Sequence, residues 1–215
     1  MKFVGTKSLS IPDIKVITFG RFPDHRGYFT ETFRKSDFQN EIPEIAEFMK
    51  DIEFTQANES FSKAGTFRGL HFQWNPYMGK LVRPITGHLI DFALDIRKNS
   101  PTFGKIIAYD MPANLDNTEA EWIWLPPGFA HGVFLPEDSL IEYMCSGEYS
   151  QGCEAGISPL AEDIDWSLCD PELKKIFDEN VPTTELITDK DKDGMTLAQW
   201  GESENSDQFI YQQTT

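Results

Sequence analysis

Residues 65–73 read Gly-Thr-Phe-Arg-Gly-Leu-His-Phe-Gln, and Lys80 follows seven residues later. This stretch brings an Arg, a His and a Lys together within a segment that is otherwise apolar and rich in strand-forming residues. In a regular strand Arg68 and His71 would lie on opposite faces, because side chains alternate. A β-bulge at Gly69 would instead direct both side chains into one cavity. Spacing alone leaves open the alternative of a core histidine beside a surface arginine.

The size and composition of the chain favour one domain. It has 215 residues, 40% of them hydrophobic, with 17 Phe and 5 Trp, which is ample for a packed core. Chains of this length commonly form a single all-β unit. We therefore expect one domain over residues 1–215, in which the segment from about 180 to 215 is less regular and carries Asp191.

The sequence shows neither a membrane segment nor an export signal. No stretch has eighteen uninterrupted apolar residues, and the N-terminus lacks an apolar signal core. The three cysteines, Cys145, Cys153 and Cys169, have no paired metal-ligand spacing. These features predict a cytoplasmic protein without a membrane partner.

The net charge of −16 argues against nucleic-acid binding, which needs a basic surface. An anionic ligand would have to be held by a local cluster of cations against this overall field. The arginines and lysines available for that purpose are Arg26, Arg68, Lys80 and Arg83.

Short runs of β-branched and aromatic residues, bounded by Gly, Pro, Asn or Asp, follow one another along most of the chain. They occupy residues 16–19, 27–33, 54–60, 80–84, 88–95, 105–110, 121–125, 132–134 and 140–145. Helical patterns are limited to residues 35–42, 44–50 and 171–179, the last with Asp170 as its N-cap. Regular short strands with turn signals predict an all-β sandwich or barrel with a few short peripheral helices.

Residues 124–134, Trp-Leu-Pro-Pro-Gly-Phe-Ala-His-Gly-Val-Phe, contain a Pro-x-Gly-x-x-His pattern that resembles the second half-motif of the cupin (jelly-roll) superfamily. Metal-binding cupins carry His-x-His and a downstream Glu in the first half-motif, where this chain has only His71. Four histidines in the whole chain cannot readily supply a three- or four-ligand site. We therefore expect no metal, and we expect His71 and His131 to serve proton chemistry or hydrogen bonding.

Further motifs extend the resemblance to one family. They are Gln56-x-Asn58-x-Ser60, Gly65-x-x-Arg68-Gly-Leu-His-Phe-Gln, Gly79-Lys-Leu-Val-Arg, Asp95-x-Arg, Ser100-Pro-Thr-Phe-Gly, Pro127-Gly-Phe-Ala-His-Gly and Tyr143. From about Pro12 to Asp191 the chain is similar to the dTDP-4-dehydrorhamnose 3,5-epimerase family. The resemblance implies a cupin-type jelly roll without metal or other cofactor, a homodimer with exchanged N-terminal strands, and a nucleotide-linked 4-keto-6-deoxy sugar as substrate.

The resemblance also implies catalytic roles. His71 would be the base, Asp191 its carboxylate partner, and Tyr143 the acid on the opposite face of the sugar. Lys80 would stabilise the enolate at the 4-keto oxygen, and His131 would support the same oxygen or orient the base. A carboxylate on the second ring nitrogen fixes the tautomer of a histidine and makes it a stronger base.

Binding positions carry over in the same way. Residues 24–31, Asp-His-Arg-Gly-Tyr-Phe-Thr-Glu, match the family's Asp-x-Arg-Gly-x-Phe-x-Glu motif. The match implies that Arg26 binds the diphosphate and that Phe29 and Glu31 lie near the nucleobase of the substrate. For Phe29, plain core packing is an alternative. The other implied contacts are Gln56, Asn58, Arg68, Tyr149, Glu154 and Lys190.

Departures from the family pattern bear on substrate scope. Tyr77-Met78 replaces a more usual polar pair in a loop expected to border the sugar, and the match is loosest between Glu148 and Asp165. We expect inversion at both C3 and C5, because Tyr143 supplies the acid on the second face. A C3-only epimerase, a keto-isomerase and a non-catalytic sugar-binding module remain alternatives, and the native nucleotide and sugar stay open.

Overall fold

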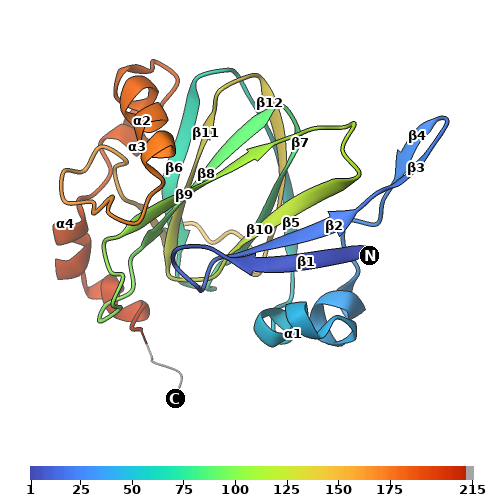
Figure 1. Ribbon diagram of the computed structural model, residues 1–215. Helices are drawn as coiled ribbons and strands as arrows, with labels where there is room; N and C mark the ends of the chain where they lie inside the picture. The colour runs from blue at the N-terminus through green and yellow to red at the C-terminus, as the bar shows by residue number, and fades with distance from the viewer. Residues whose placement is uncertain (212–215) are drawn as a thin grey trace.

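The computed structural model describes residues 1–211 and contains two large antiparallel sheets (Figure 1). The six-stranded sheet has the order β1 (Phe3–Ser8), β2 (Lys15–Gly20), β10 (Glu119–Leu125), β7 (Lys80–Thr86), β12 (Ser139–Cys145) and β5 (Gln56–Ser62). The five-stranded sheet has the order β13 (Glu154–Gly156), β6 (Thr66–Gln73), β11 (Phe129–Leu135), β8 (His88–Asp95) and β9 (Ile106–Pro112). The predicted all-β architecture is confirmed.

A hydrophobic core fills the space between the two sheets. Side chains alternate along each strand, so that one residue points into this core and the next points out. On β7, for example, Val82 packs between the sheets with Ile141 and Val133, whereas Leu81 points to the outer face.

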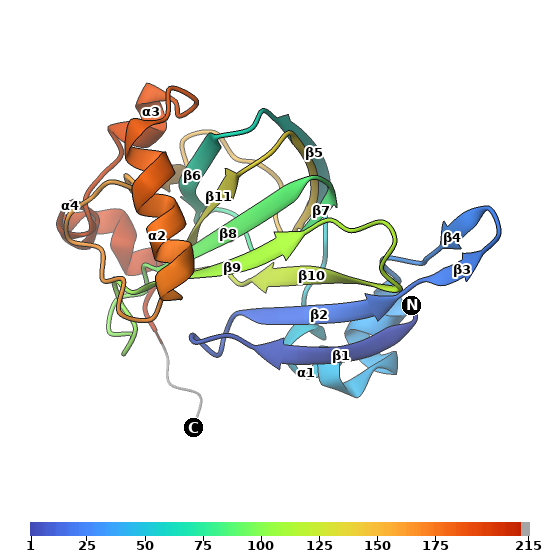
Figure 2. The same cartoon turned by 45° about the horizontal axis from the view of Figure 1, so that its top comes forward.

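Short helices cover the outer faces of both sheets (Figure 2). α1 (Pro43–Met49) and the π-helical turn Asp37–Glu41 pack on the six-stranded sheet through Ile45 and Phe38. α2 (Pro171–Asn180) and α4 (Leu197–Glu202) pack on the five-stranded sheet through Phe177 and Trp200. The predicted helix at 171–179 is confirmed, and Asp170 accepts hydrogen bonds from the backbone N–H groups of residues 172 and 173.

Some sequence-based boundaries were wrong. The strand predicted over 27–33 ends at Phe29, because Phe33 turns away to pack with the rings of Phe38 and Phe54. The expected less regular segment beyond about residue 180 contains α3 (Asp189–Lys192), α4 and the short 3₁₀ helices Val181–Thr183 and Glu204–Gln208.

A separate two-stranded hairpin, β3 (Phe22–Asp24) and β4 (Gly27–Phe29), projects from the body of the molecule (Figures 1 and 2). Every residue of both strands is exposed, including the rings of Phe22, Tyr28 and Phe29. The hairpin therefore presents aromatic side chains and Arg26 away from its own chain's core.

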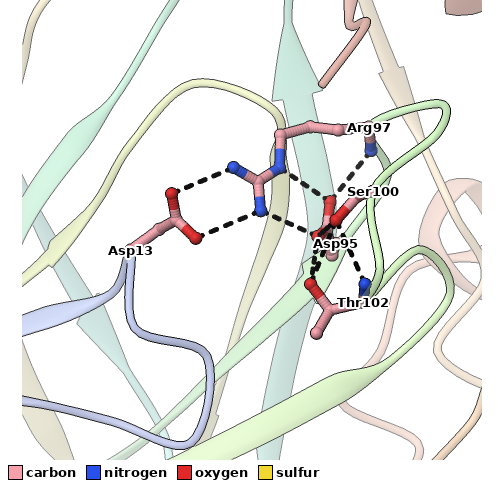
Figure 3. A network of polar contacts seen from close by, with 5 residues as sticks. All are labelled: Asp13, Asp95, Arg97, Ser100 and Thr102. Atoms are coloured by element: carbon pink, nitrogen blue, oxygen red, sulfur yellow. Dashed lines mark hydrogen bonds and ion pairs between the residues drawn. The ribbon is translucent and has the colours of Figure 1, made fainter. Parts of the chain in front are cut away.

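Buried ion pairing explains two motifs of the sequence, Asp95-x-Arg and Ser100-Pro-Thr (Figure 3). Arg97 donates to both carboxylate oxygens of Asp95, at 2.9 and 2.8 Å, and to those of Asp13, at 3.1 and 3.3 Å. The hydroxyls of Ser100 and Thr102 also donate to Asp95, each at 2.6 Å. Burial raises the pKa of Asp95, but these donors outweigh it and the pKa lies below its ordinary value. This network ties the turn after β8 to the loop before β2.

Candidate active site

A cavity of about 750 Å³ lies between the two sheets. The five-stranded sheet contributes residues of β6 and β11, the six-stranded sheet contributes residues of β5, β7 and β12, and the segment that ends in α3 covers one side. Among the predicted site residues, those that line it are Arg68, His71, Lys80, His131, Tyr143, Lys190 and Asp191. The structure thus gathers all the predicted catalytic side chains.

A β-bulge at Gly69 directs Arg68 and His71 to the same cavity, which is one of the two arrangements that the spacing left open. His71 pairs with His131 and Arg68 pairs with Val133, so β6 contains one extra residue between these pairs. Gly69 has a φ of +126°, and a Cβ there would collide with the backbone of Gly132. Glycine is required at this position both for its conformation and for the close approach of the two strands.

His71 is oriented by a carboxylate from the far end of the chain. Its Nε2 donates to Oδ1 of Asp191 at 2.7 Å, and the backbone N–H of Gly69 donates to Oδ2 at 3.3 Å. Burial raises the pKa of Asp191, but the hydrogen bond and charge of His71 outweigh it, so the pKa lies below its ordinary value. The side chain of Asp191 is 5% exposed and that of His71 is 42% exposed, so the ring can reach a ligand while its partner cannot.

His131 has an aspartate partner of its own, which the sequence analysis missed. Its Nε2 donates to Oδ2 of Asp91 at 2.7 Å, and both side chains are buried. Burial lowers the pKa of His131 despite Asp91, and the charges of Lys80 and His71 lower it further. His131 is therefore a neutral hydrogen-bonding group at neutral pH. An aspartate inside the apolar run of β8 was the available signal, since a buried carboxylate needs a donor.

Lys80 and Tyr143 project into the cavity from the six-stranded sheet. Burial lowers the pKa of Lys80, while Cys145, Asp91 and Glu154 favour its charged form. Burial also raises the pKa of Tyr143, so its phenol is protonated at neutral pH. The cavity therefore holds a protonated phenol on the sheet opposite His71.

Arg68 and Lys190 supply positive charge to the cavity lining. The guanidinium of Arg68 is fixed by hydrogen bonds to the Ser62 hydroxyl at 3.0 Å and to the Phe61 carbonyl at 3.4 Å. Lys190 forms an ion pair with Glu154 at 3.4 Å. Both cations can attract an anionic ligand although the whole chain is acidic.

The predicted residues Gln56, Asn58, Tyr149 and Glu154 form a linked polar group beside the cavity. Gln56 donates to Asn58 at 3.1 Å and accepts from the backbone N–H of Tyr149 at 2.8 Å. The phenol of Tyr149 donates to Glu154 at 3.0 Å, and Glu154 in turn pairs with Lys190. Hydrogen bonds thus connect this polar group to the cavity lining.

The structure does not bring the remaining predicted residues to the cavity of their own chain. Arg26 and Phe29 lie on the exposed β3–β4 hairpin, where Arg26 pairs with Asp24 at 2.7 Å. Glu31 binds the N-terminal amine at 2.5 Å and Arg34 at 2.8 Å. The loop residue Tyr77 is absent from the cavity lining too, because its hydroxyl donates to the carbonyl of Gln208 at 3.0 Å.

Comparison with known proteins decides the family. Residues 8–199 match the family described as dTDP-4-dehydrorhamnose 3,5-epimerase. The dTDP-4-dehydrorhamnose 3,5-epimerase of Shigella flexneri is 38% identical over 167 residues, which cover 76% of this chain and 87% of that protein. The chain belongs to the dTDP-4-dehydrorhamnose 3,5-epimerase family. The predicted family and enzyme class, an isomerase, are confirmed.

Solved structures of the family share the architecture. The epimerase of Legionella pneumophila in complex with dTDP-4-keto-L-rhamnose is 26% identical and has a TM-score of 0.76. The superposition covers 98% of this chain and 99% of that chain. A 3'-monoepimerase of Streptomyces bikiniensis in complex with dTDP-quinovose is also 26% identical, with a TM-score of 0.68 and coverage of 89% of this chain and 87% of that chain. The predicted cupin-type jelly roll is confirmed by this similarity.

Residues 1–211 show neither the arrangement of a metal site nor a helix that could span a membrane. No group of three or more His, Cys, Asp or Glu in this part of the chain has the arrangement of a metal site. None of its helices has both the length and the apolar character needed to cross a membrane.

Proposed function

We propose that the protein inverts C3 and C5 of a dTDP-linked 4-keto-6-deoxy sugar, converting dTDP-4-dehydro-6-deoxyglucose to dTDP-4-dehydrorhamnose. The observation that carries this proposal is the placement of His71 and Tyr143 on opposing sheets of one cavity. Inversion of a carbon next to a ketone needs a base on one face of the sugar ring and an acid on the other. A base and a protonated phenol that face each other across the ring meet that requirement.

His71 acts as the base. Its Nε2–H is held by Asp191, so the second ring nitrogen carries the lone pair that accepts the proton from carbon. As the imidazolium forms, the carboxylate of Asp191 stabilises its charge at 2.7 Å. The same His71–Asp191 pair serves C3 and C5 in turn. The ring of His71, which is more exposed than Asp191, is the group that reaches each carbon.

Lys80 and His131 stabilise the enolate. Removal of the proton moves negative charge onto the 4-keto oxygen, where an ammonium group and a fixed N–H donor lower the barrier. Both side chains line the cavity with His71: His131 lies on β11, next to β6, and Lys80 lies on β7 of the opposite sheet. Tyr143 then returns a proton from the opposite sheet, which inverts the centre.

The diphosphate is bound by Arg68 together with Arg26 from a second copy of the chain. Arg26 cannot serve its own cavity in the observed arrangement, but its hairpin projects outward with three exposed aromatic rings. A homodimer that exchanges this segment would place Arg26 and Phe29 at the partner's cavity. Gln56, Asn58, Tyr149, Glu154, Lys190 and Glu31 would complete the nucleotide contacts.

Incubation with dTDP-4-keto-6-deoxyglucose in deuterated water tests the proposed reaction. The wild-type protein should incorporate deuterium at C3 and C5, as NMR or mass spectrometry would show. His71→Gln should abolish incorporation, and Asp191→Asn should slow it by about 10²-fold or more. His88→Gln, the same change at a histidine outside the cavity, should exchange at the wild-type rate. A wild-type protein that binds the nucleotide sugar without exchange would instead be a binding module.

A cytoplasmic location belongs to the same proposal. Its support is that Cys145, Cys153 and Cys169 are all free thiols, as is usual in a reducing compartment.

A further inference from the structure

A second charged site lies at the base of the β3–β4 hairpin, around Arg21. The side chain follows β2 and is 7% exposed. Its Nη1 donates to the carbonyls of Asn114 at 2.6 Å and Asn117 at 2.8 Å, in the loop between β9 and β10. The ring of Tyr28 lies 4.2 Å from the guanidinium carbon. These contacts hold one edge and one face of the guanidinium.

The other edge of the guanidinium is not used by residues 1–211. Nε is buried and has no acceptor, the side-chain hydrogen bonds of Arg21 within residues 1–211 both start at Nη1, and none of the ion pairs in this part of the chain includes Arg21. A buried cation without a counter-charge is strongly destabilising. The pair Nε and Nη2 is also the edge that binds a carboxylate through two parallel hydrogen bonds.

A cavity of about 240 Å³ adjoins this guanidinium. The apolar residues Pro84, Met111 and Ala113 form part of its wall, and Asn114 and Asn117 line it as well. Its volume suits a small molecule of a few heavy atoms. The cavity does not share a lining residue with the larger cavity that contains His71.

Two glutamates also line the cavity and restrict what it can bind. Glu121 is already engaged, because it accepts from the Tyr109 phenol at 2.7 Å and pairs with Lys7 at 3.6 Å. Glu119 is exposed and therefore hydrated. Their negative charge opposes a doubly charged phosphate more than a singly charged carboxylate.

We propose that this cavity binds a small organic carboxylate on the Nε–Nη2 edge of Arg21, with its carbon skeleton against Pro84 and Met111. The site is separate from the proposed epimerase site and does not depend on it.

Titration with acetate, propionate and malonate tests the proposal, with melting temperature and calorimetry as readouts and chloride keeping the ionic strength constant. The wild-type protein should show saturable binding and a matching rise in melting temperature. Arg21→Lys keeps the charge but lacks the planar fork, so the Kd should rise at least about tenfold. Carboxylates that bind instead at His71, Lys80 or Arg68 would bind the wild type and Arg21→Lys equally. The comparison therefore distinguishes binding at Arg21 from binding in the larger cavity.

A second variant covers the case in which changing Arg21 disturbs the loop. Ala113→Leu leaves Arg21 and the backbone hydrogen bond of residue 113 to Gly87 in place but fills the cavity, so it should also abolish binding. The proposal is overturned if the wild-type protein binds none of the carboxylates, or if either variant binds them as the wild type does. It is equally overturned if inorganic phosphate binds more tightly than all three.

Discussion

At the scale of single residues, the two cavity histidines differ although each is paired with an aspartate. The side chain of His71 is 42% exposed, whereas that of His131 is 10% exposed. Exposure makes the first ring accessible to a ligand in the cavity, as the proposed role of a base requires. Burial keeps the second ring neutral, so that it can only donate a hydrogen bond from a fixed position.

Tyr143→Phe tests the proposed acid. Loss of the phenol removes the proton donor on the six-stranded sheet while leaving the His71 base in place, so deuterium should still enter the substrate. The inverted product should fall by about 10²-fold or more. Product analysis by NMR would measure inversion at C3 and C5 separately. A variant that retains full double inversion would rule out Tyr143 as the acid, and a wild type that inverts only C3 would show a monoepimerase.

Burial of His131 predicts a dependence of stability on pH. Its pKa is lowered in the folded state, so below about pH 6.5 the unfolded chain binds a proton that the folded chain does not. The contribution of the neutral His131 ring to the unfolding free energy is therefore present above that pH and is lost as the pH falls. Between pH 7.5 and 5.5 the wild type should lose about 1 kcal/mol more unfolding free energy than His131→Gln, as urea titrations would measure. His25→Gln, at an exposed position, should keep the wild-type pH dependence.

At the scale of elements, the bulge in β6 sets the geometry of the cavity. An unbulged strand would turn either Arg68 or His71 to the outer face, which α2 and α4 cover. The bulge also lets the backbone N–H of Gly69 reach Asp191. One irregular residue thus positions His71, its partner Asp191 and the cation of Arg68.

Gly69→Ala should damage both stability and activity. The added methyl group would meet the backbone of Gly132, and the φ of +126° is unfavourable for alanine. We expect a loss of at least about 2 kcal/mol in unfolding free energy and a large drop in exchange rate. Gly5→Ala is the control, since nothing lies within 4 Å of its Cβ position and it should change stability little. A Gly69→Ala protein with wild-type stability would contradict this account.

At the scale of the whole molecule, the proposed binding residues are divided between two regions that one chain does not join. Arg68 lines the cavity, whereas Arg26 and Phe29 lie on a hairpin that projects from the body (Figure 2). The proposed dimer would join these regions between two chains. It would also cover aromatic rings that water otherwise surrounds.

Complementation between two inactive variants tests this exchange. Arg26→Ala and His71→Gln chains are co-expressed with different tags, and the heterodimer is purified through both tags. One of its two cavities would combine an intact His71 with an intact partner hairpin, so it should recover about half of the wild-type exchange rate. Each homodimer serves as the control for its own residual activity. A heterodimer no more active than the Arg26→Ala homodimer would show that each cavity is completed within one chain.

Local sequence determined the elements whose signals are local. The strand predicted over 88–95 has the observed bounds of β8, and α2 begins after its Asp170 cap, because periodicity and capping act within a few residues. The bulge was one of two arrangements that the local sequence left open, because a glycine between Arg68 and His71 permits it without requiring it. Family resemblance, not periodicity, identified Asp191 as the partner of His71.

Tertiary structure alone decided which distant residues meet. Asp91 binds His131 across two strands, Arg21 reaches the loop at Asn114, and Phe33 leaves the predicted strand for a ring cluster. Such contacts depend on sheet register and packing, which bring together residues far apart in the chain. The sequence by itself therefore determined most of the strands and the residue types of the site, while the fold decided the bulge and selected the partners of each side chain.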